Sequence, residues 1–374
     1  MKKKVFTAIG LMSGTSMDGV DLSIIKSDGN NEFVSILDNY WEFDLKIREK
    51  LIGLRKKINL YDDLHKYAKE LNNLEREITL FHSKLVDRTI RDYKDEIDLI
   101  GFHGQTIFHN PDKKISRQLG DGGLLSQLSK KIVINNFRDK DLQNGGQGAP
   151  LTPIFHKLIS NIISKKYKID FPINFLNIGG ITNITHIGNS FYACDIGPGN
   201  CLIDEWTRKN SKLNYDDGGN FAKAGKINEL ILNQAIDNFR INTYNKSLDV
   251  NDFNLSFMRG IDFVDGSATI TNFTAYLISK GIEHVIKKTN NKGIYLICGG
   301  GRKNTKLIED INNYLNDKEL KLKNIDEYGL DGDFIESQTF AYLAIRSFLK
   351  LPVSFPETTG CKSPAIAGMM NKNF

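Results

Sequence analysis

A run of hydroxyl-bearing residues and glycines near the N-terminus has the types and spacing for phosphate chemistry. Gly14, Thr15, Ser16, Asp18 and Gly19 put two hydroxyls, a carboxylate and backbone N–H groups into one turn. Such a turn can bind phosphate, because glycine lets the backbone approach closely and Asp18 could orient a Mg²⁺ ion. No Gly-Lys-Ser/Thr sequence closes the turn, so it is not a P-loop. A plain hairpin tip is the alternative interpretation.

Two further groups of polar residues follow predicted strands. His103 and Gln105 come after an apolar run at 97–102, and Arg138 follows another at 131–135. Sites in open α/β sheets lie where strands end, so His103 and Gln105 are candidates for substrate binding. An arginine in such a place can hold a carboxylate or phosphate through two parallel hydrogen bonds. An internal salt bridge is the alternative for Arg138, and a structural histidine is the alternative for His103.

Two carboxylates in the second half are further candidates. Asp195 ends a predicted strand at 191–195, directly before a Gly-Pro-Gly turn that opens a helix. This is a strong position for a catalytic carboxylate, although Asp195 could instead be the N-cap of that helix. Glu336 lies on the last predicted helix and is either an ion-pair partner or a site residue.

Three glycine-rich segments could accept a ligand against the backbone. Gly179 and Gly180 join two predicted strands, and Gly299 and Gly300 join a strand to a helix, where a flat ring or a phosphate could lie. The segment 144–150 contains three glycines and a proline. It could be a hinge or a ligand loop.

The elements that must position these residues occur twice along the chain. The first half is predicted to form strands at 5–12, 20–26 and 33–43, a long helix with an apolar seam over 64–85, and strands at 97–102 and 131–135. The second half is predicted to form strands at 173–178, 181–187, 191–195, 294–298 and 320–325, with helices at 198–209, 227–239, 268–288, 304–315 and 334–349. Each half opens with a glycine-tipped hairpin in a three-strand meander. This predicts an α/β fold made of two duplicated domains with a cleft between them.

The domain division is expected between residues 137 and 138. The first domain would then span 1–137 and the second 138–374, with a C-terminal segment that could return to the first domain. One hydrophobic core seldom grows beyond about 250 to 300 residues, so two domains suit a chain of 374 residues.

Composition excludes several classes of protein. With 40% hydrophobic and 25% charged residues, the chain has the proportions of a soluble globular protein. The net charge of +5 is dispersed among acidic residues, which argues against nucleic-acid binding. No run approaches the roughly 18 apolar residues of a membrane helix. Four cysteines without a C-x-x-C pair favour a reducing cytoplasm.

The motifs occur in the order found in one enzyme family. In this order the chain resembles the anhydro-N-acetylmuramic acid kinases. The motifs that carry the resemblance are Gly14-Thr15-Ser16-Met17-Asp18-Gly19-Val20-Asp21, His103-Gly104-Gln105-Thr106, Gly145-Gly146-Gln147-Gly148-Ala149-Pro150, Asn177-Ile178-Gly179-Gly180 and Asp195-Ile196-Gly197-Pro198-Gly199-Asn200. The resemblance runs from end to end. It implies the actin-like ATPase and sugar-kinase fold, with two ribonuclease-H-like domains that close on ATP.

The resemblance also implies a reaction and roles for residues. The family phosphorylates O6 of 1,6-anhydro-N-acetylmuramic acid with ATP while water opens the anhydro bond, during cell-wall recycling. Asp195 would be the catalytic base, Arg138 would hold the sugar together with His103, Gln105 and Glu336, and Asp18 would be a ligand of Mg²⁺. The residues that would bind ATP are Gly14, Thr15, Ser16, Met17, Asp18, Gly19, Val20, Asp21, Gly179, Gly180, Gly299 and Gly300.

Two positions depart from the family pattern as we expect it. Ser337-Gln338-Thr339 is more polar than the Ala/Phe-rich sequence expected after Glu336, and Asn136 stands where Asp is expected before Phe-Arg. Two rival functions stay open, namely another sugar kinase of the same superfamily and an ATP-dependent regulatory module. The expected partners are the sugar and ATP, with no nucleic acid or membrane, and a homodimer stays open.

Overall fold

The computed structural model describes residues 4–14, 16–239, 244, 247–316 and 320–374. The chain forms two compact units: unit 1 consists of Met1–Ile159 and Phe334–Phe374, and unit 2 consists of Ser160–Asp333. Unit 1 therefore extends beyond the expected range of 1–137. Aromatic packing explains the difference, because the Phe155 ring lies 5.0 Å from that of Phe33 and 5.5 Å from that of Tyr342, all within unit 1.

Unit 1 is built on a sheet of seven strands. The strand order is β12-β6-β4-β1-β2-β3, and β5 pairs with β4. Strands β1, β2 and β3 form an antiparallel meander, whereas β4 and β6 run parallel to β1. The strands are β1 (Phe6–Ser13), β2 (Gly19–Ser27), β3 (Phe33–Glu42), β4 (Leu99–Asn110), β5 (Ile115–Leu119), β6 (Ile132–Asn135) and β12 (Met369–Asn371).

Unit 2 repeats this arrangement with five strands in the order β11-β10-β7-β8-β9. Again the first three strands form an antiparallel meander and the next two run parallel to the first. These strands are β7 (Ile173–Ile178), β8 (Ile181–Ile187), β9 (Phe191–Pro198), β10 (Ile294–Cys298) and β11 (Lys321–Asn324). The same order and directions in both sheets confirm the prediction of an α/β protein with two duplicated ribonuclease-H-like cores.

The helices of unit 1 include several that the sequence patterns did not indicate. The helices are α1 (Leu45–Lys57), α2 (Tyr61–Lys66), α3 (Ala68–Asp92), α4 (Gly122–Ser129), α5 (Asp139–Gln143), α12 (Ile335–Phe348) and α13 (Pro356–Thr359), while α6 (Pro153–Tyr167) crosses the boundary between the units. The predicted helix over 64–85 is two helices that meet at Tyr67. Its apolar seam does face the core, since Leu71, Leu74 and Ile78 are buried.

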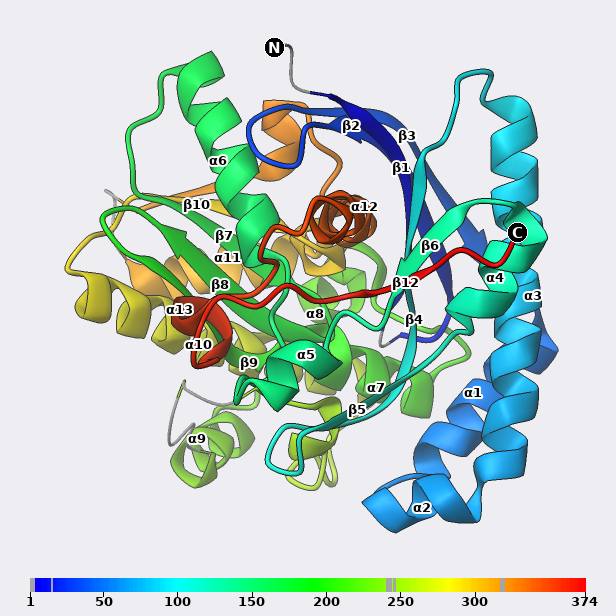
Figure 1. Ribbon diagram of the computed structural model, residues 1–374. Coiled ribbons are helices and arrows are strands. Elements are labelled where there is room, and N and C mark those ends of the chain that lie inside the picture. The colour runs from blue at the N-terminus through cyan, green and yellow to red at the C-terminus, as the bar shows by residue number, and fades with distance from the viewer. Residues whose placement is uncertain (1–3, 15, 240–243, 245–246, 317–319) are drawn as a thin grey trace. The chain divides into compact units, whose positions relative to one another are not determined.

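Helix α12 packs against strands β1, β2 and β4 in the middle of the unit 1 sheet (Figure 1). Two glycines permit this close approach. A Cβ atom on Gly10 would lie 1.9 Å from the carbonyl oxygen of Ser337, and one on Gly101 would lie 2.1 Å from that of Phe340. The backbone of the helix therefore rests directly on the strands, and neither position can hold any other residue without movement of the helix.

A polar cluster joins the same helix to the sheet and explains the departure at 337–339. The hydroxyls of Ser337 and Ser23 lie 2.6 Å apart, Ser23 Oγ donates to Asp38, and Gln338 Nε2 donates to both carboxylate oxygens of Asp38. Ser337 and Gln338 are fully buried. Buried polar groups need partners, and the hydroxyls of Ser23 and Ser337 and the side-chain nitrogen of Gln338 find theirs within this cluster.

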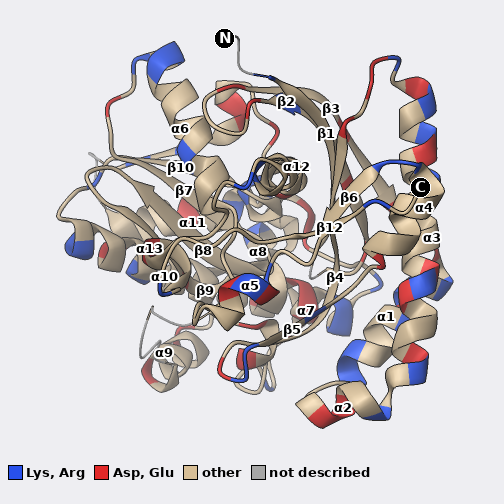
Figure 2. Ribbon diagram, viewed as in Figure 1, with Lys and Arg blue, Asp and Glu red and all other residues tan. Residues whose placement is uncertain are grey.

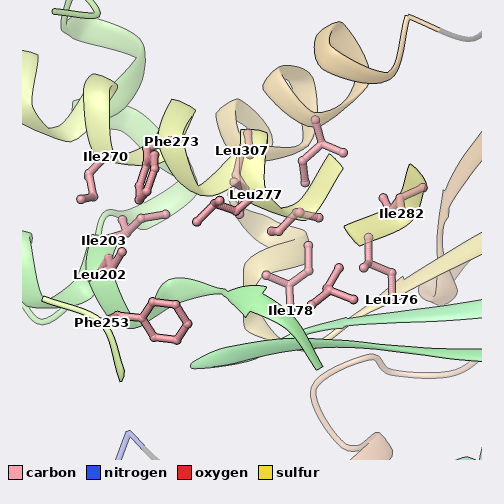
Figure 3. Packing of buried hydrophobic residues seen from close by; sticks show 14 of the residues in the cluster. Leu176, Ile178, Leu202, Ile203, Phe253, Ile270, Phe273, Leu277, Ile282 and Leu307 are labelled. Carbon is pink, nitrogen blue, oxygen red and sulfur yellow. The ribbon is translucent and has the colours of Figure 1, made fainter. Parts of the chain in front are cut away.

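The helices of unit 2 surround a single apolar core. They are α7 (Asn200–Asn210), α8 (Asn220–Ala224), α9 (Glu229–Asn238), α10 (Phe263–Thr289) and α11 (Thr305–Leu315), with 3-10 turns at Asp217–Gly219, Val250–Asp252, Gly300–Lys303 and Ile325–Tyr328. Figure 3 shows Phe273 and Leu277 of α10 above Leu176 and Ile178 of the sheet. In unit 2 the helix, and not the strand, supplies the glycine at the close contact. This residue is Gly281 of α10, where an added Cβ would lie 2.4 Å from Cβ of Ile196 on β9.

The charged residues form no block of one sign on the outer helices of unit 1. Figure 2 shows Lys and Arg interspersed with Asp and Glu along α1 and α3, and Lys50 Nζ lies 2.6 Å from Glu77 Oε1. Such exposed pairs contribute about 1 kcal/mol or less. Among the helices that the structure describes, none combines the length and the apolar character that a bilayer span requires.

Candidate active site

The hydroxyl- and glycine-rich turn connects β1 to β2, as predicted. Thr15 lies outside the described residues. The Ser16 hydroxyl donates to Asp18 Oδ1 at 2.5 Å, and the Gly14 carbonyl accepts a hydrogen bond of 3.0 Å from Gln105 Nε2. Met17 has a φ of 56° and its side chain is buried, so it fixes the turn to the core. The turn is thus fixed to the core through Met17 and Gln105, while Ser16 is exposed and Asp18 is half-buried.

Most of the remaining residues of this motif take part in packing or in strand pairing. Val20 is buried in the core, and a Cβ atom on Gly19 would lie 2.3 Å from the carbonyl oxygen of Trp41. Asp21 lies on β2, where it pairs with Met12 and Tyr40 in the ladder. Gly14 differs from Gly19, because the nearest atom to its added Cβ is 3.7 Å away. Protein packing therefore requires Gly19 but leaves room at Gly14.

The strand that carries His103 and Gln105 is longer than predicted. It does not end at 102 but runs on to Asn110 and pairs with β5. The motif nevertheless marks an edge, since the parallel pairing with β6 ends at Phe102 and that with β1 ends at Gln105. His103 and Gln105 therefore lie at the end of the parallel part of the sheet, where sites of α/β proteins are found.

His103 and Arg138 are brought together in unit 1. Nδ1 of His103 lies 2.7 Å from the Gly104 carbonyl oxygen, so this nitrogen donates, and Nε2 accepts from Nε and Nη2 of Arg138 at 3.2 and 3.0 Å. Burial, and then the charge of Arg138, lowers the pKa of His103 well below its usual range. The imidazole is thus neutral and orients the guanidinium without adding charge.

The glycine-rich loop 144–150 also contributes to the position of Arg138. Nη1 of Arg138 donates to the Gly148 carbonyl at 2.7 Å, and the Gly148 N–H donates to the buried carboxylate of Asp141 at 2.7 Å. Asp141 also accepts from the Thr359 hydroxyl at 2.6 Å, and Gln147 N–H donates to the Thr359 carbonyl. These bonds fix the loop within unit 1. The sequence patterns do not indicate Asp141, although an acid three residues after Arg138 lies about one helical turn away from it.

Glu336 lies at the start of a helix, and Asn136 lies in a turn that precedes one. Glu336 is half-buried in the first turn of α12, where a carboxylate is favoured by the helix dipole. Asn136 has a φ of 55°, a conformation that Asn tolerates better than most residues, and its Nδ2 donates to Asp139 at 2.7 Å. The amide at position 136 is thus used within the turn ahead of α5.

Asp195 lies in unit 2 within β9, which does not end at 195 as predicted but runs on to Pro198. Its side chain is only 8% exposed, and Oδ2 accepts from the Leu248 N–H at 2.8 Å and from the Ser247 hydroxyl at 3.3 Å. The helix that follows begins at Asn200 with Gly199 as its N-cap residue. The N-cap interpretation of Asp195 is therefore wrong, and the carboxylate is held by donors from another part of the chain.

The neighbour of Asp195 is excluded as a nucleophile. Burial raises the pKa of the Cys194 thiol to about 12, and its side chain belongs to the apolar core of unit 2. A thiol with so high a pKa stays protonated at neutral pH, and only the thiolate is strongly nucleophilic. Of these two adjacent residues, only Asp195 can accept a proton.

The glycine turns of unit 2 meet the start of α7 and the end of β10. The Gly179 and Gly180 carbonyls accept from the backbone N–H groups of Asn200 and Gly199 at 2.7 and 2.9 Å. Gly299 has a φ of 78°, and a Cβ there would lie 2.5 Å from Asn177 Oδ1. At Gly179 and Gly300, in contrast, the nearest atoms to an added Cβ are 3.5 and 3.7 Å away.

Three of the motif glycines leave space at the backbone that a nucleotide could occupy. Gly14, Gly179 and Gly300 have neither a positive φ nor a neighbour that excludes a side chain. An open backbone of this kind lets a phosphate or a ring approach, which a side chain would prevent. For Mg²⁺, no group of three or more His, Cys, Asp or Glu in the described part of the chain is arranged to hold a metal. Asp18 fits the usual alternative, in which one carboxylate acts together with phosphate oxygens and water.

Comparison with known proteins gives a consistent result over the whole chain. The family described as "Anhydro-N-acetylmuramic acid kinase" matches residues 6–373. An anhydro-N-acetylmuramic acid kinase of Pelagibacter ubique is 51% identical over all of both chains. Those of Agrobacterium fabrum and Brucella canis are each 34% identical, the first over 98% of this chain and 99% of its own, the second over 97% of both. The chain therefore belongs to the anhydro-N-acetylmuramic acid kinase family.

Proposed function

We propose that this chain uses ATP and water to convert 1,6-anhydro-N-acetylmuramic acid into N-acetylmuramic acid 6-phosphate, in the recycling of cell-wall sugars in the cytoplasm. The observation that carries the proposal is the buried Asp195 carboxylate of β9, which accepts hydrogen bonds from Leu248 and Ser247. A fixed carboxylate at that place suits a general base better than a structural cap.

One carboxylate is enough for this reaction. Ordinary glycoside cleavage needs an acid to protonate the leaving oxygen and a second carboxylate to activate water. Here the leaving oxygen is O6, which forms a bond to the γ-phosphorus of ATP as its bond to C1 breaks. Water forms the new bond to C1 and passes a proton to Asp195, and ADP leaves. The phosphoryl group thus replaces the acid.

The roles in unit 1 concern binding. Arg138 would hold the lactyl carboxylate of the sugar, since Arg binds carboxylates in a planar geometry and its orientation is set by His103 and Gly148. Gln105 contributes by holding the turn at Gly14. Glu336 would contact the sugar.

The nucleotide would be held by backbone and by Asp18. Gly14 in unit 1 and Gly179 and Gly300 in unit 2 would contact ATP, because each leaves space at the backbone where a side chain would otherwise lie. Asp18 would hold Mg²⁺, and the ion would supply positive charge to the phosphates, which phosphoryl transfer requires along with positioning. The protein itself supplies the orientation of the groups.

Isotope labelling tests the reaction. In H₂¹⁸O the product should carry ¹⁸O in the hydroxyl at C1, because water attacks that carbon. Simple kinase chemistry would leave C1 unlabelled. A product that is phosphorylated but unlabelled at C1 would contradict the proposal and favour another sugar kinase.

Replacing the base tests the assignment of Asp195. Asp195→Asn should lower turnover by about 10²- to 10⁴-fold, the usual contribution of general-base catalysis. ATP and sugar binding, measured by calorimetry, should persist. Asp237→Asn is the matched control, because it removes the same charge from an exposed position of α9 in the same unit. Near wild-type turnover of Asp195→Asn would show that another group accepts the proton.

A further inference from the structure

Asn183 is the residue directly opposite Asp195 in the sheet. The two are Cα partners in the antiparallel pair of β8 and β9, next to a bulge between Thr182 and Asn183. The adjacent pair, Ile184 and Cys194, points into the apolar core of unit 2. Because side chains alternate between the faces of a strand, Asn183 and Asp195 share the opposite face. Opposed residues in such a pair have Cβ atoms about 4.5 to 5.5 Å apart.

The amide of Asn183 has an unused acceptor. Its Oδ1 is buried and receives no hydrogen bond from the described residues. Asn174 on the neighbouring strand β7 shows the usual state: its Oδ1 accepts from His186 at 2.7 Å, and its Nδ2 donates to two carbonyls at 3.1 Å. Buried amide oxygens in proteins are nearly always paired, so an unpaired one beside a candidate base indicates that a bound molecule supplies the donor.

We propose that Asn183 holds the attacking water together with Asp195. The inference rests on the proposed function. The water has two O–H groups: one donates to Asp195, which accepts the proton as the bond to C1 forms, and the other donates to Asn183 Oδ1. With both hydrogens bound, the lone pair of the water oxygen is directed at C1. The second proton stays on the new C1 hydroxyl, so Asn183 orients the water and accepts no proton.

This role makes a specific demand on the nucleophile. Methanol has one O–H, which Asp195 can accept, but no second O–H for Asn183. The wild-type enzyme should therefore prefer water over methanol, and a variant without the Asn183 acceptor should lose that preference. A residue that only supports the fold would change the rate with both nucleophiles equally.

The test uses the full chain in a water–methanol mixture and separates the two products, the free sugar 6-phosphate and its methyl glycoside. Asn183→Leu keeps the volume and removes the acceptor. Turnover in water should fall by about tenfold or more, and the ratio of methyl glycoside to free sugar should rise by about tenfold, the effect of one lost hydrogen bond. Thr185→Val, two residues along the same strand and away from Asp195, is the control and should keep the wild-type ratio.

The outcomes separate the inference from the proposed function. An unchanged product ratio in Asn183→Leu overturns the inference, whether or not the rate falls, and so does methyl glycoside formation by neither protein. If Asn183→Leu does not fold, Asn183→Ala gives the same readout with a smaller side chain. A wild-type protein that makes no 6-phosphate from the anhydro sugar overturns the proposed function as well.

Discussion

The two units share one sheet design but achieve close packing of a helix in opposite ways. In unit 1 the glycines are in the strands, at Gly10 and Gly101 beneath α12. In unit 2 the glycine is in the helix, at Gly281 of α10 against Ile196. Strand order and direction are therefore common to both halves, whereas the residue that permits close approach is not. A close contact needs one small residue, and either partner can supply it.

The largest expected loss of stability comes from a substitution that disrupts the contact between α12 and the sheet of unit 1. Gly101→Ala places a Cβ atom 2.1 Å from a backbone carbonyl, which can move only if the whole of α12 moves. We expect a loss of about 3 kcal/mol or more in the free energy of unfolding, at the upper end of overpacking effects. Urea unfolding measures the change. Gly53→Ala, on α1 with open space at Cβ, is the control and should gain about 0.5–1 kcal/mol.

Acid should weaken unit 1 before unit 2. Burial lowers the pKa of His82 to about 4 and that of His156 to about 3, and both lie in unit 1. The unfolded chain binds protons near pH 6.5, so this stability is complete above 6.5 and is lost as the pH falls toward 4. At pH 5 the loss from His82 alone should be about 1–2 kcal/mol.

Hydrogen exchange resolves this difference by unit. After correction for intrinsic exchange rates, peptides from α3 and β4 should lose protection between pH 7 and pH 5 before peptides from β7 and α10. The histidines of unit 2 are the buried His186 and the half-buried His284, and burial lowers the pKa of each by less than it lowers those of His82 and His156. Earlier loss of protection in β7 and α10 would contradict the expectation.

The smallest expected effect concerns the reversed contact. Gly281→Ala places a Cβ atom 2.4 Å from Cβ of Ile196, a longer contact than the 2.1 Å that a Cβ on Gly101 makes with a backbone carbonyl oxygen. Alanine also favours the helix by about 1 kcal/mol, which offsets part of the overpacking. We expect a net loss of about 1 kcal/mol, seen as a small decrease in Tm. A loss as large as that of Gly101→Ala would show that the two contacts are equally rigid.

The strands could be predicted better than the helices of unit 1. The predicted strands at 173–178 and 181–187 coincide with β7 and β8, because each is a short, mostly buried run bounded by glycine or proline. Helices α1 and α6 and strand β5 were missed. In α1 the signal is weak, since Ile47, Leu51 and Leu54 are its buried residues among many charged ones. Helix α6 begins three residues after the glycine-rich segment 144–150, whose glycines and proline predict a loop.

The candidate site also contains residues that the sequence predicts and residues that it does not. Asp195 and the glycine turns are recognisable from the sequence, because a carboxylate or a pair of glycines beside an apolar run is a local signal. The link from His103 through Arg138 and Gly148 to Asp141 joins residues far apart in the sequence, and it depends on the register of β4 against β6. Asn183 and Asp195 likewise become neighbours only through the register of β8 and β9. No spacing along the chain contains that information.

The return of the C-terminal segment to unit 1 has a consequence for synthesis on the ribosome. Helix α12 and strand β12 are the last long helix and the last strand to be made, yet they pack on β1, β4 and β6, which are made much earlier. Unit 2 is continuous in sequence and is complete at Asp333. Domains generally fold as units once their residues are available. The half that begins second is therefore complete first, and the N-terminal strands remain without their central helix until residues 335–348 have been translated.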